Sequence, residues 1–225
     1  MERVSSRIKI NVESLSDLIF GLALSIGSIF LLGNSSTNRW TVLSNLVAFG
    51  FSFLILVIIW ARYKRTVSVL HVETGLILEL NIAMLFLVAI EPYLFNLLLS
   101  GASLSNFSFS NPPPEITDFT SQLYAIDIGS IYLILGTLTY AVIRNQGLNR
   151  TEALHPTLLR SLKQSMHAQL TESLLFLISA FPVFWTYHIL PGVPIRLSFW
   201  GLSFIASSIS RIVGIALQKS GQLKS

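Results

Sequence analysis

The sequence predicts an all-α membrane protein in which a single domain, residues 1–225, holds six transmembrane helices. The first observation is composition, since 52% of the residues are hydrophobic, only 12% are charged and the mean hydropathy is +0.66. The second is run length, because a spanning helix needs roughly 20 mostly apolar residues. The third is length, because 225 residues leave room for about six such spans and short loops but for no separate soluble domain.

The apolar runs set the expected order of the helices along the chain. The segment between the third and fourth runs, residues 101–121, contains three consecutive prolines and is expected to be non-helical. A short amphipathic helix at the membrane surface could follow Pro156. We expect spans near residues 15–33, 43–61, 76–99, 122–143, 169–190 and 197–217.

The basic residues predict the orientation of these spans. With six spans both termini lie on one side of the membrane, and that side holds all of the 15 Lys and Arg residues except Arg39 and Arg196. Because cytoplasmic loops are enriched in Lys and Arg, we expect both termini to be cytoplasmic. This topology, with attraction to anionic lipid heads, accounts for the basic pI, so no nucleic-acid partner is expected.

Small or polar residues share one side of the helix expected from residues 14–32, since a helix advances about 100° per residue. In one interpretation, Gly21 and Ser25 let a neighbouring helix approach closely, and Asp17 pairs at the interface. In another, this side faces a narrow water-filled path that closes by dewetting. The small or polar residues are Asp17, Gly21, Ser25 and Ser28, and the bulky residues beside them are Leu22, Ile26 and Ile29.

Ionisable residues inside the expected spans are costly unless they are paired or face water. Those near the inner ends are expected to pair, for example Arg211 with Glu172. Glu91 lies about 22 Å along its helix, directly before Pro92, where a kink is expected. It could concentrate cations at the outer mouth of a pore, or it could pair with one of the two outer arginines.

The patterns expected of an enzyme or a metal protein are missing. The chain has no Cys, and its four His residues show no i, i+4 pairing. No nucleophile elbow surrounds a serine, and no glycine-rich phosphate loop is present. We therefore expect neither catalysis nor a bound cofactor or metal.

Further motif residues occur in each of the first four expected spans. The first segment has a Ser-Asp pair followed by a small residue, apolar residues and a hydroxyl, and the second ends its apolar run at Trp60. The third has Asn81 near its inner end and Pro92 near its outer end, and the fourth opens with Leu-Tyr. The segments are NVESLSDLIFGLALS (11–25), FSFLILVIIWARYKR (51–65), LELNIAMLFLVAIEP (78–92) and QLYAIDIGSIYLILG (122–136).

In this order the four segments resemble the transmembrane-protein-175 family of potassium channels, in its prokaryotic form with a single six-helix unit. The first helix of that family carries R-x-x-x-F-S-D, and Ser16 and Asp17 match its last two residues. Asn11 and Leu15 stand at the Arg and Phe positions, and Tyr63 stands where the family has a His.

The resemblance implies a homotetramer in the cell membrane of a prokaryote, with the first helix of each subunit lining a central pore for K⁺ ions. It also implies an apolar constriction on that helix, a hydroxyl layer close to it, and a polar network that holds the helix in place. The constriction residues would be Leu22, Ile26 and Ile29, the hydroxyl would be Ser25, and the network would be Ser16, Asp17, Trp60 and Asn81.

The function we expect is therefore that of a cation channel permeable to potassium, whose partners are further copies of the chain, the lipid bilayer and monovalent cations. One alternative is a secondary transporter that binds a small solute between helices, although no inverted repeat is visible. Another is a membrane scaffold of the same fold that does not conduct ions.

Overall fold

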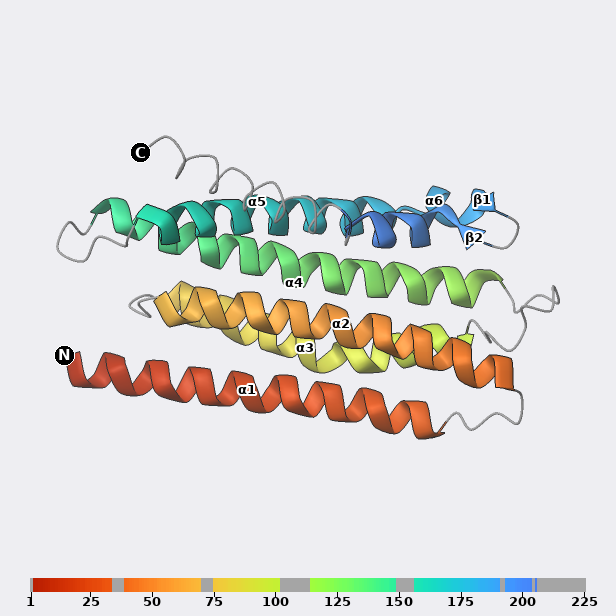
Figure 1. The fold of residues 1–225 in the computed structure, drawn as a ribbon, viewed down its shortest axis with the longest axis horizontal. Helices are drawn as coiled ribbons and strands as arrows, with labels where there is room; N and C mark the ends of the chain where they lie inside the picture. Colours follow the sequence, from red (N-terminus) through yellow and green to blue (C-terminus); the bar gives the residue numbers. More distant parts are fainter. Residues whose placement is uncertain are drawn as a thin grey trace, which may run out of the picture.

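The long helices of the chain run alternately in opposite directions and form an elongated bundle (Figure 1). The computed structural model describes residues 2–33, 39–69, 75–101, 114–148, 156–190, 193–203 and 205. The long helices are α1 (Glu2–Gly33), α2 (Arg39–Val69), α3 (Gly75–Gly101), α4 (Pro114–Leu148) and α5 (Pro156–Ser179). We call the end of the bundle at which α1 begins the amino end, so α2 and α4 finish there while α3 and α5 begin there.

Short elements follow α5 at the opposite end of the bundle (Figure 1). These are the four-residue helix α6 (Val183–Thr186) and the strands β1 (His188–Leu190) and β2 (Val193–Pro194), which pair antiparallel. Residues 195–203 are again helical. The described part of the chain is therefore all-α apart from one small hairpin.

Within the described residues, three helices are long and apolar enough to cross a membrane. Their apolar segments are Asn45–Val69, Gly75–Leu98 and Asp118–Arg144, so they coincide with the second, third and fourth expected spans. On α1, Ser14–Ile29 forms a shorter apolar segment. Most of the sixth expected span, 197–217, lies outside the described residues.

The fifth expected span is wrong in its second half. The helix that contains its start begins at Pro156 and ends at Ser179, before residues 183–190 form α6 and β1. Pro182 has no backbone N–H to continue the helix, and the amide of Phe181 already bonds the Ile178 carbonyl over three residues. Nor is a separate surface helix found after Pro156, because α5 is continuous.

The segment 101–121 also differs from its expected non-helical form. Helix α4 begins at Pro114, the last of the three prolines, and so includes the final part of this segment. Proline is well suited to the first helical position, where its missing N–H would have had no partner within the helix.

Helix α4 lies at the centre of the core, between α3 on one side and α5 on the other (Figure 1). Tyr124 of α4 contacts the Trp200 ring at a centroid distance of 5.1 Å, and Trp200 stacks on Phe176 of α5 at 6.0 Å. Two glycines bring α4 and α5 together. A Cβ atom at Gly129 would lie 2.8 Å from Leu177 Cγ, and one at Gly136 would lie 3.0 Å from a Leu170 methyl.

Candidate functional site: the exposed face of the first helix

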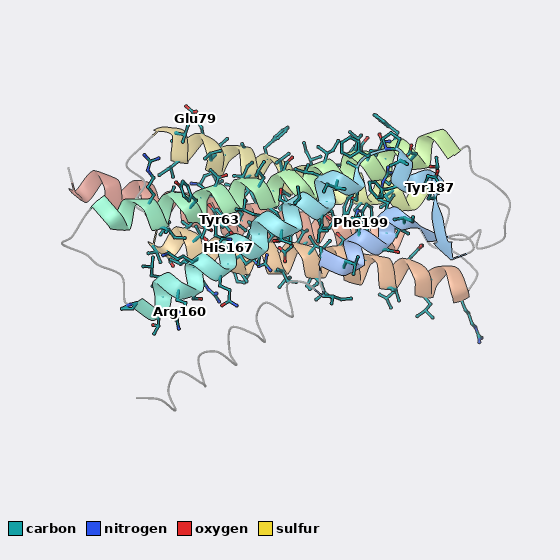
Figure 2. The ribbon with its side chains drawn as sticks, turned by 90° about the horizontal axis from the view of Figure 1, so that it is seen from above. Tyr63, Glu79, Arg160, His167, Tyr187 and Phe199 are labelled. Carbon is teal, nitrogen blue, oxygen red and sulfur yellow. The ribbon has the colours of Figure 1, made fainter. Side chains whose placement is uncertain are left out.

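Helix α1 has one side against the bundle and one side that no other described residue covers. Ser16, Phe20 and Ala23 are buried where α1 packs on α2 and α3. Phe20 lies against the ring of Tyr63 with centroids 6.0 Å apart, and Figure 2 shows Tyr63 inside the bundle. These contacts fix the rotation of α1, and therefore which residues face outward.

The outward side of α1 carries large apolar residues at helical spacing. Leu18, Leu22 and Ile29 are 66%, 52% and 64% exposed, and Ser25 is exposed between Leu22 and Ile29. The steps of four, three and four residues place this series along one line of the helix. We call the side formed by these four residues and Gly21 the outer face of α1.

The serines on this side of α1 are bonded to their own helix. The Ser25 hydroxyl donates to the Gly21 carbonyl at 2.8 Å, and the Ser28 hydroxyl donates to the Leu24 carbonyl at 3.0 Å. A hydroxyl has one donor and two acceptor lone pairs. Since the proton points back to the helix, the lone pairs of the oxygen face outward, which suits contact with a cation or with water.

The space around Gly21 differs from the space around Gly27, the other glycine in this part of α1. A Cβ atom at Gly21 would meet nothing within 4 Å, whereas one at Gly27 would lie 3.2 Å from the Phe49 ring. Gly27 therefore allows a close approach between α1 and α2, whereas Gly21 serves no contact with another described element. Close approach at Gly21 is therefore open to a second copy of the chain.

Two residues modify the predicted constriction. Ile26 is only partly exposed, so it lies at the side of the outer face rather than at its centre. Leu18 is 66% exposed and lies one turn before Leu22, yet sequence reasoning missed it. Its spacing of four residues from Leu22 and seven from Ser25 could have identified it.

Asp17 joins α1 to α2 at the side of the outer face. Its carboxylate accepts a hydrogen bond from Trp60 Nε1 at 3.1 Å and forms an ion pair with Lys64 Nζ at 2.5 Å. The structure thus brings together two members of the predicted network. Lys64 was not predicted, although it lies one turn after Trp60 and so on the same side of α2.

The other two predicted network residues, Ser16 and Asn81, are both buried. Asn81 donates from Nδ2 to the Ile77 carbonyl of its own helix at 3.0 Å, while its buried Oδ1 accepts no hydrogen bond. Asn81 therefore does not share the contacts that Asp17 makes with α2.

Glu91 is fully buried between α2, α3 and α4, which does not fit the expected outer-mouth role. Its Oε1 accepts hydrogen bonds from Ser52 at 2.7 Å and from Tyr124 at 3.2 Å. Its place in the sequence predicts its depth along α3 but not the side of the helix from which it projects. It pairs with neither of the two outer arginines.

The buried arginines have other acidic partners. Arg62 of α2 forms a bidentate ion pair with Glu172 of α5. Glu172 therefore has a partner other than Arg211, the expected one, which lies outside the described residues. Arg196 pairs with Asp118 at 2.7 Å and donates from Nε to the Ser179 carbonyl at 2.7 Å. Burial lowers the pKa of the Arg196 guanidinium, and the hydrogen bond and charge of Asp118 oppose this effect.

Among the described residues, no group of three or more His, Asp or Glu side chains could hold a metal ion. Comparison with known proteins gives no match, whether with family models, curated proteins or solved structures. The fold and the outer face of α1 must therefore be interpreted from this chain alone.

Proposed function

We propose that this chain is a subunit of a cation channel permeable to potassium, in which the outer face of α1 lines a pore shared by several copies. One observation carries the proposal. No other described element covers the outer face, yet it combines exposed bulky residues with the outward lone pairs of Ser25. A helix that only contacts lipid would gain nothing from Gly21 and Ser25 at these positions.

An oligomer follows from geometry, because a single α1 cannot surround a path for ions. Copies related by rotation about an axis would bring their outer faces together in a closed ring. Gly21 would allow adjacent helices to approach closely there. Four copies are the number that the resemblance to potassium channels suggests.

Such a ring would place different chemistry at successive depths. Leu22 and Ile29 lie about 10 Å apart along the helix axis and would form two apolar constrictions, with the Ser25 hydroxyls between them. Narrow apolar rings close by excluding water, and rings of hydroxyls can replace part of the hydration shell of an ion. The ion would therefore pass a polar layer enclosed by two gates.

The orientation that we propose places the amino end of the bundle in the cytoplasm of a prokaryotic cell. Arg65, Arg144, Arg160 and Lys163 lie on the parts of α2, α4 and α5 that reach this end. Arg39 and Arg196 lie towards the opposite end. This asymmetry supports the direction given by the excess of basic residues on the cytoplasmic side of membrane proteins.

Potassium flux from liposomes that contain the purified protein tests the proposal. We expect Leu22→Asn to raise resting flux about tenfold, as a barrier lower by ~1.4 kcal/mol would, because a polar ring stays wet. Leu22→Phe should reduce flux. Leu54→Asn is the matched control, since Leu54 is 55% exposed on α2 and should not change flux.

Flux must be normalised to assembled protein, measured as the mass of the oligomer of 25.0 kDa chains in mild detergent. If Asn at Leu22, Ile26 and Ile29 in turn never raises flux, the outer face only packs and the channel proposal fails. A protein that conducts as a monomer would refute the shared pore, and one that exchanges a solute without conducting would be a transporter.

A further inference from the structure

A second polar site lies inside the subunit, away from the outer face of α1. Glu91 of α3 is 0% exposed and Asp127 of α4 is 4% exposed. Both lie within apolar segments long enough to cross a membrane. Asp127 lies three residues after Tyr124 on the same side of α4, and the Tyr124 hydroxyl donates to Glu91, so two acids share one buried region of low dielectric.

Hydrogen-bond donors in this region are too few for two carboxylates. The hydroxyls of Ser52 and Tyr124 both donate to Oε1 of Glu91, so neither proton remains for another acceptor. Glu91 Oε2 and Asp127 Oδ2 are buried and receive no hydrogen bond from the described residues. Each buried acceptor without a donor costs free energy, and the cost is larger for a charged group.

Pro92 adds one more acceptor beside Glu91. A proline inside a helix has no N–H to donate to the carbonyl four residues earlier, which here is the carbonyl of Val88 in the middle of α3. Val88 is itself fully buried. Pro92 therefore removes one backbone donor from the part of α3 that holds Glu91.

The described cations that form salt bridges on the surrounding elements pair with other acids and not with Glu91 or Asp127. Arg62 of α2 pairs with Glu172 of α5. Arg196 lies four residues before Trp200, whose ring contacts Tyr124, and it pairs with Asp118. On α1, Asp17 pairs with Lys64 of α2. No described cation forms a salt bridge with Glu91 or Asp127.

We infer that Glu91 and Asp127 form a proton-binding site between α3 and α4, in which protons supply the positive charge and the missing donors. A proton needs no additional cavity, and the described residues provide no third acidic or His ligand for a metal ion. A protonated carboxyl can donate to an acceptor while its other oxygen still accepts. The inference is independent of whether α1 lines a pore.

The site makes stability depend on pH in a defined direction. If the native state holds protons that the unfolded chain loses above the ordinary pKa of carboxyl groups, about 4, stability must fall as pH rises. The unfolding equilibrium constant should increase about tenfold per pH unit for each proton that the native state retains and the unfolded state does not. At a pH high enough to remove the protons from the native state, ionisation would place negative charges between α3 and α4.

The test compares thermal unfolding of the purified protein in detergent across a series of pH values. We expect the stability of the wild type to fall with rising pH, and Glu91→Gln with Asp127→Asn to remove most of this dependence. Both substitutions place an amide donor where the acid carries its proton, so the substituted forms should fold. Glu79→Gln is the control, because Glu79 is exposed on the same helix and projects away from the bundle (Figure 2).

Infrared spectra give a direct readout that does not depend on stability. The wild type at neutral pH should show the carbonyl band of protonated carboxyl groups, and each single substitution should remove part of it. Absence of this band from the wild type would overturn the inference. It would also be overturned if stability responded to added Na⁺, K⁺ or Ca²⁺ at fixed ionic strength but not to pH, since a bound cation would then occupy the site.

Discussion

Two kinds of hydrogen bond satisfy many of the polar side chains within the described helices. Exposed hydroxyls bond the carbonyl one turn earlier, as Ser25, Thr137 and Thr171 do. Asp17 and Glu172 instead bond side chains of a different helix. A hydroxyl can therefore face lipid or water at little cost, whereas the charged side chains connect helices and oppose their separation.

Asp17 provides a prediction for a single residue. Asp17→Asn removes the charge that pairs with Lys64 and weakens the acceptor for Trp60. Because the pair is partly exposed, we expect the free energy of unfolding to fall by only about 1 kcal/mol. Lys64→Met should cost a similar amount, and the double substitution should cost less than the sum. Thermal unfolding of the four proteins measures this coupling.

The exposed residue Lys163 on α5 supplies the control, and Lys163→Met should have no coupling with Asp17→Asn. Strict additivity of Asp17→Asn and Lys64→Met would show that the contact contributes nothing. In that case the contacts between α1 and α2 that matter are the apolar packing around Phe20 and Gly27 and the hydrogen bond from Trp60.

Helices α4 and α5 pack closely where α4 has a glycine and therefore no side chain. At Gly129 a Cβ atom would lie 2.8 Å from Leu177 Cγ and 3.3 Å from the Leu177 backbone nitrogen, and Ser173 also donates to the Gly129 carbonyl at 2.8 Å. The neighbouring helix cannot withdraw without breaking this bond. Close packing at this position therefore requires glycine.

The element-scale prediction is that Gly129→Ala lowers the free energy of unfolding by about 1–3 kcal/mol, the usual cost of overpacking a core. Gly50→Ala is the matched control, because a Cβ there would meet nothing within 4 Å. Since Ala favours helix over Gly, the control should gain about 0.5–1 kcal/mol. Denaturation of both variants decides the matter, and an equal gain at Gly129 would contradict the tight α4–α5 contact.

The sequence predicted helices best where apolar runs are long. The second, third and fourth spans were located because their apolar runs are uninterrupted, but α5 buries Gln169, Glu172 and Ser173 against protein. Hydropathy cannot tell a polar residue that faces another helix from one that faces water. The end of α5 at Ser179 could have been inferred from Pro182. The hydrogen bond from Arg196 to the Ser179 carbonyl could not, because it is a tertiary contact.

The candidate site was predictable to the extent that it depends on local helical geometry. Leu22, Ser25 and Ile29 share one side of α1 because of their spacing alone, and their exposure agrees with it. Glu91 was misplaced because position along α3 gives depth and not direction. Its partners Ser52 and Tyr124 come from α2 and α4, a tertiary arrangement that the sequence does not reveal.

At the scale of the whole molecule, the bundle is asymmetric in chemistry although its helices alternate in direction. The described basic residues of α4 and α5 lie at the amino end, and the hairpin of β1 and β2 lies at the opposite end (Figure 1). Arg196 holds the base of this hairpin through the carbonyls at the end of α5 and through Asp118 of α4. Because this arginine has internal partners, it does not add a free positive charge to its end of the bundle.

The last prediction tests this asymmetry in the membrane. The chain has no Cys, so a single introduced cysteine reports its own location with no background from the wild type. Tyr187 is 63% exposed at the hairpin end (Figure 2), and Ser68 is exposed near the amino end of the bundle, in the last turn of α2.

In intact cells an impermeant maleimide should label Tyr187→Cys almost as fully as in permeabilised cells, and it should label Ser68→Cys only after permeabilisation. The expected difference follows from the excess of Lys and Arg at the amino end, which favours a cytoplasmic position. The reverse pattern would invert the proposed orientation, and equal labelling of both sites in intact cells would show that these helices do not cross the membrane.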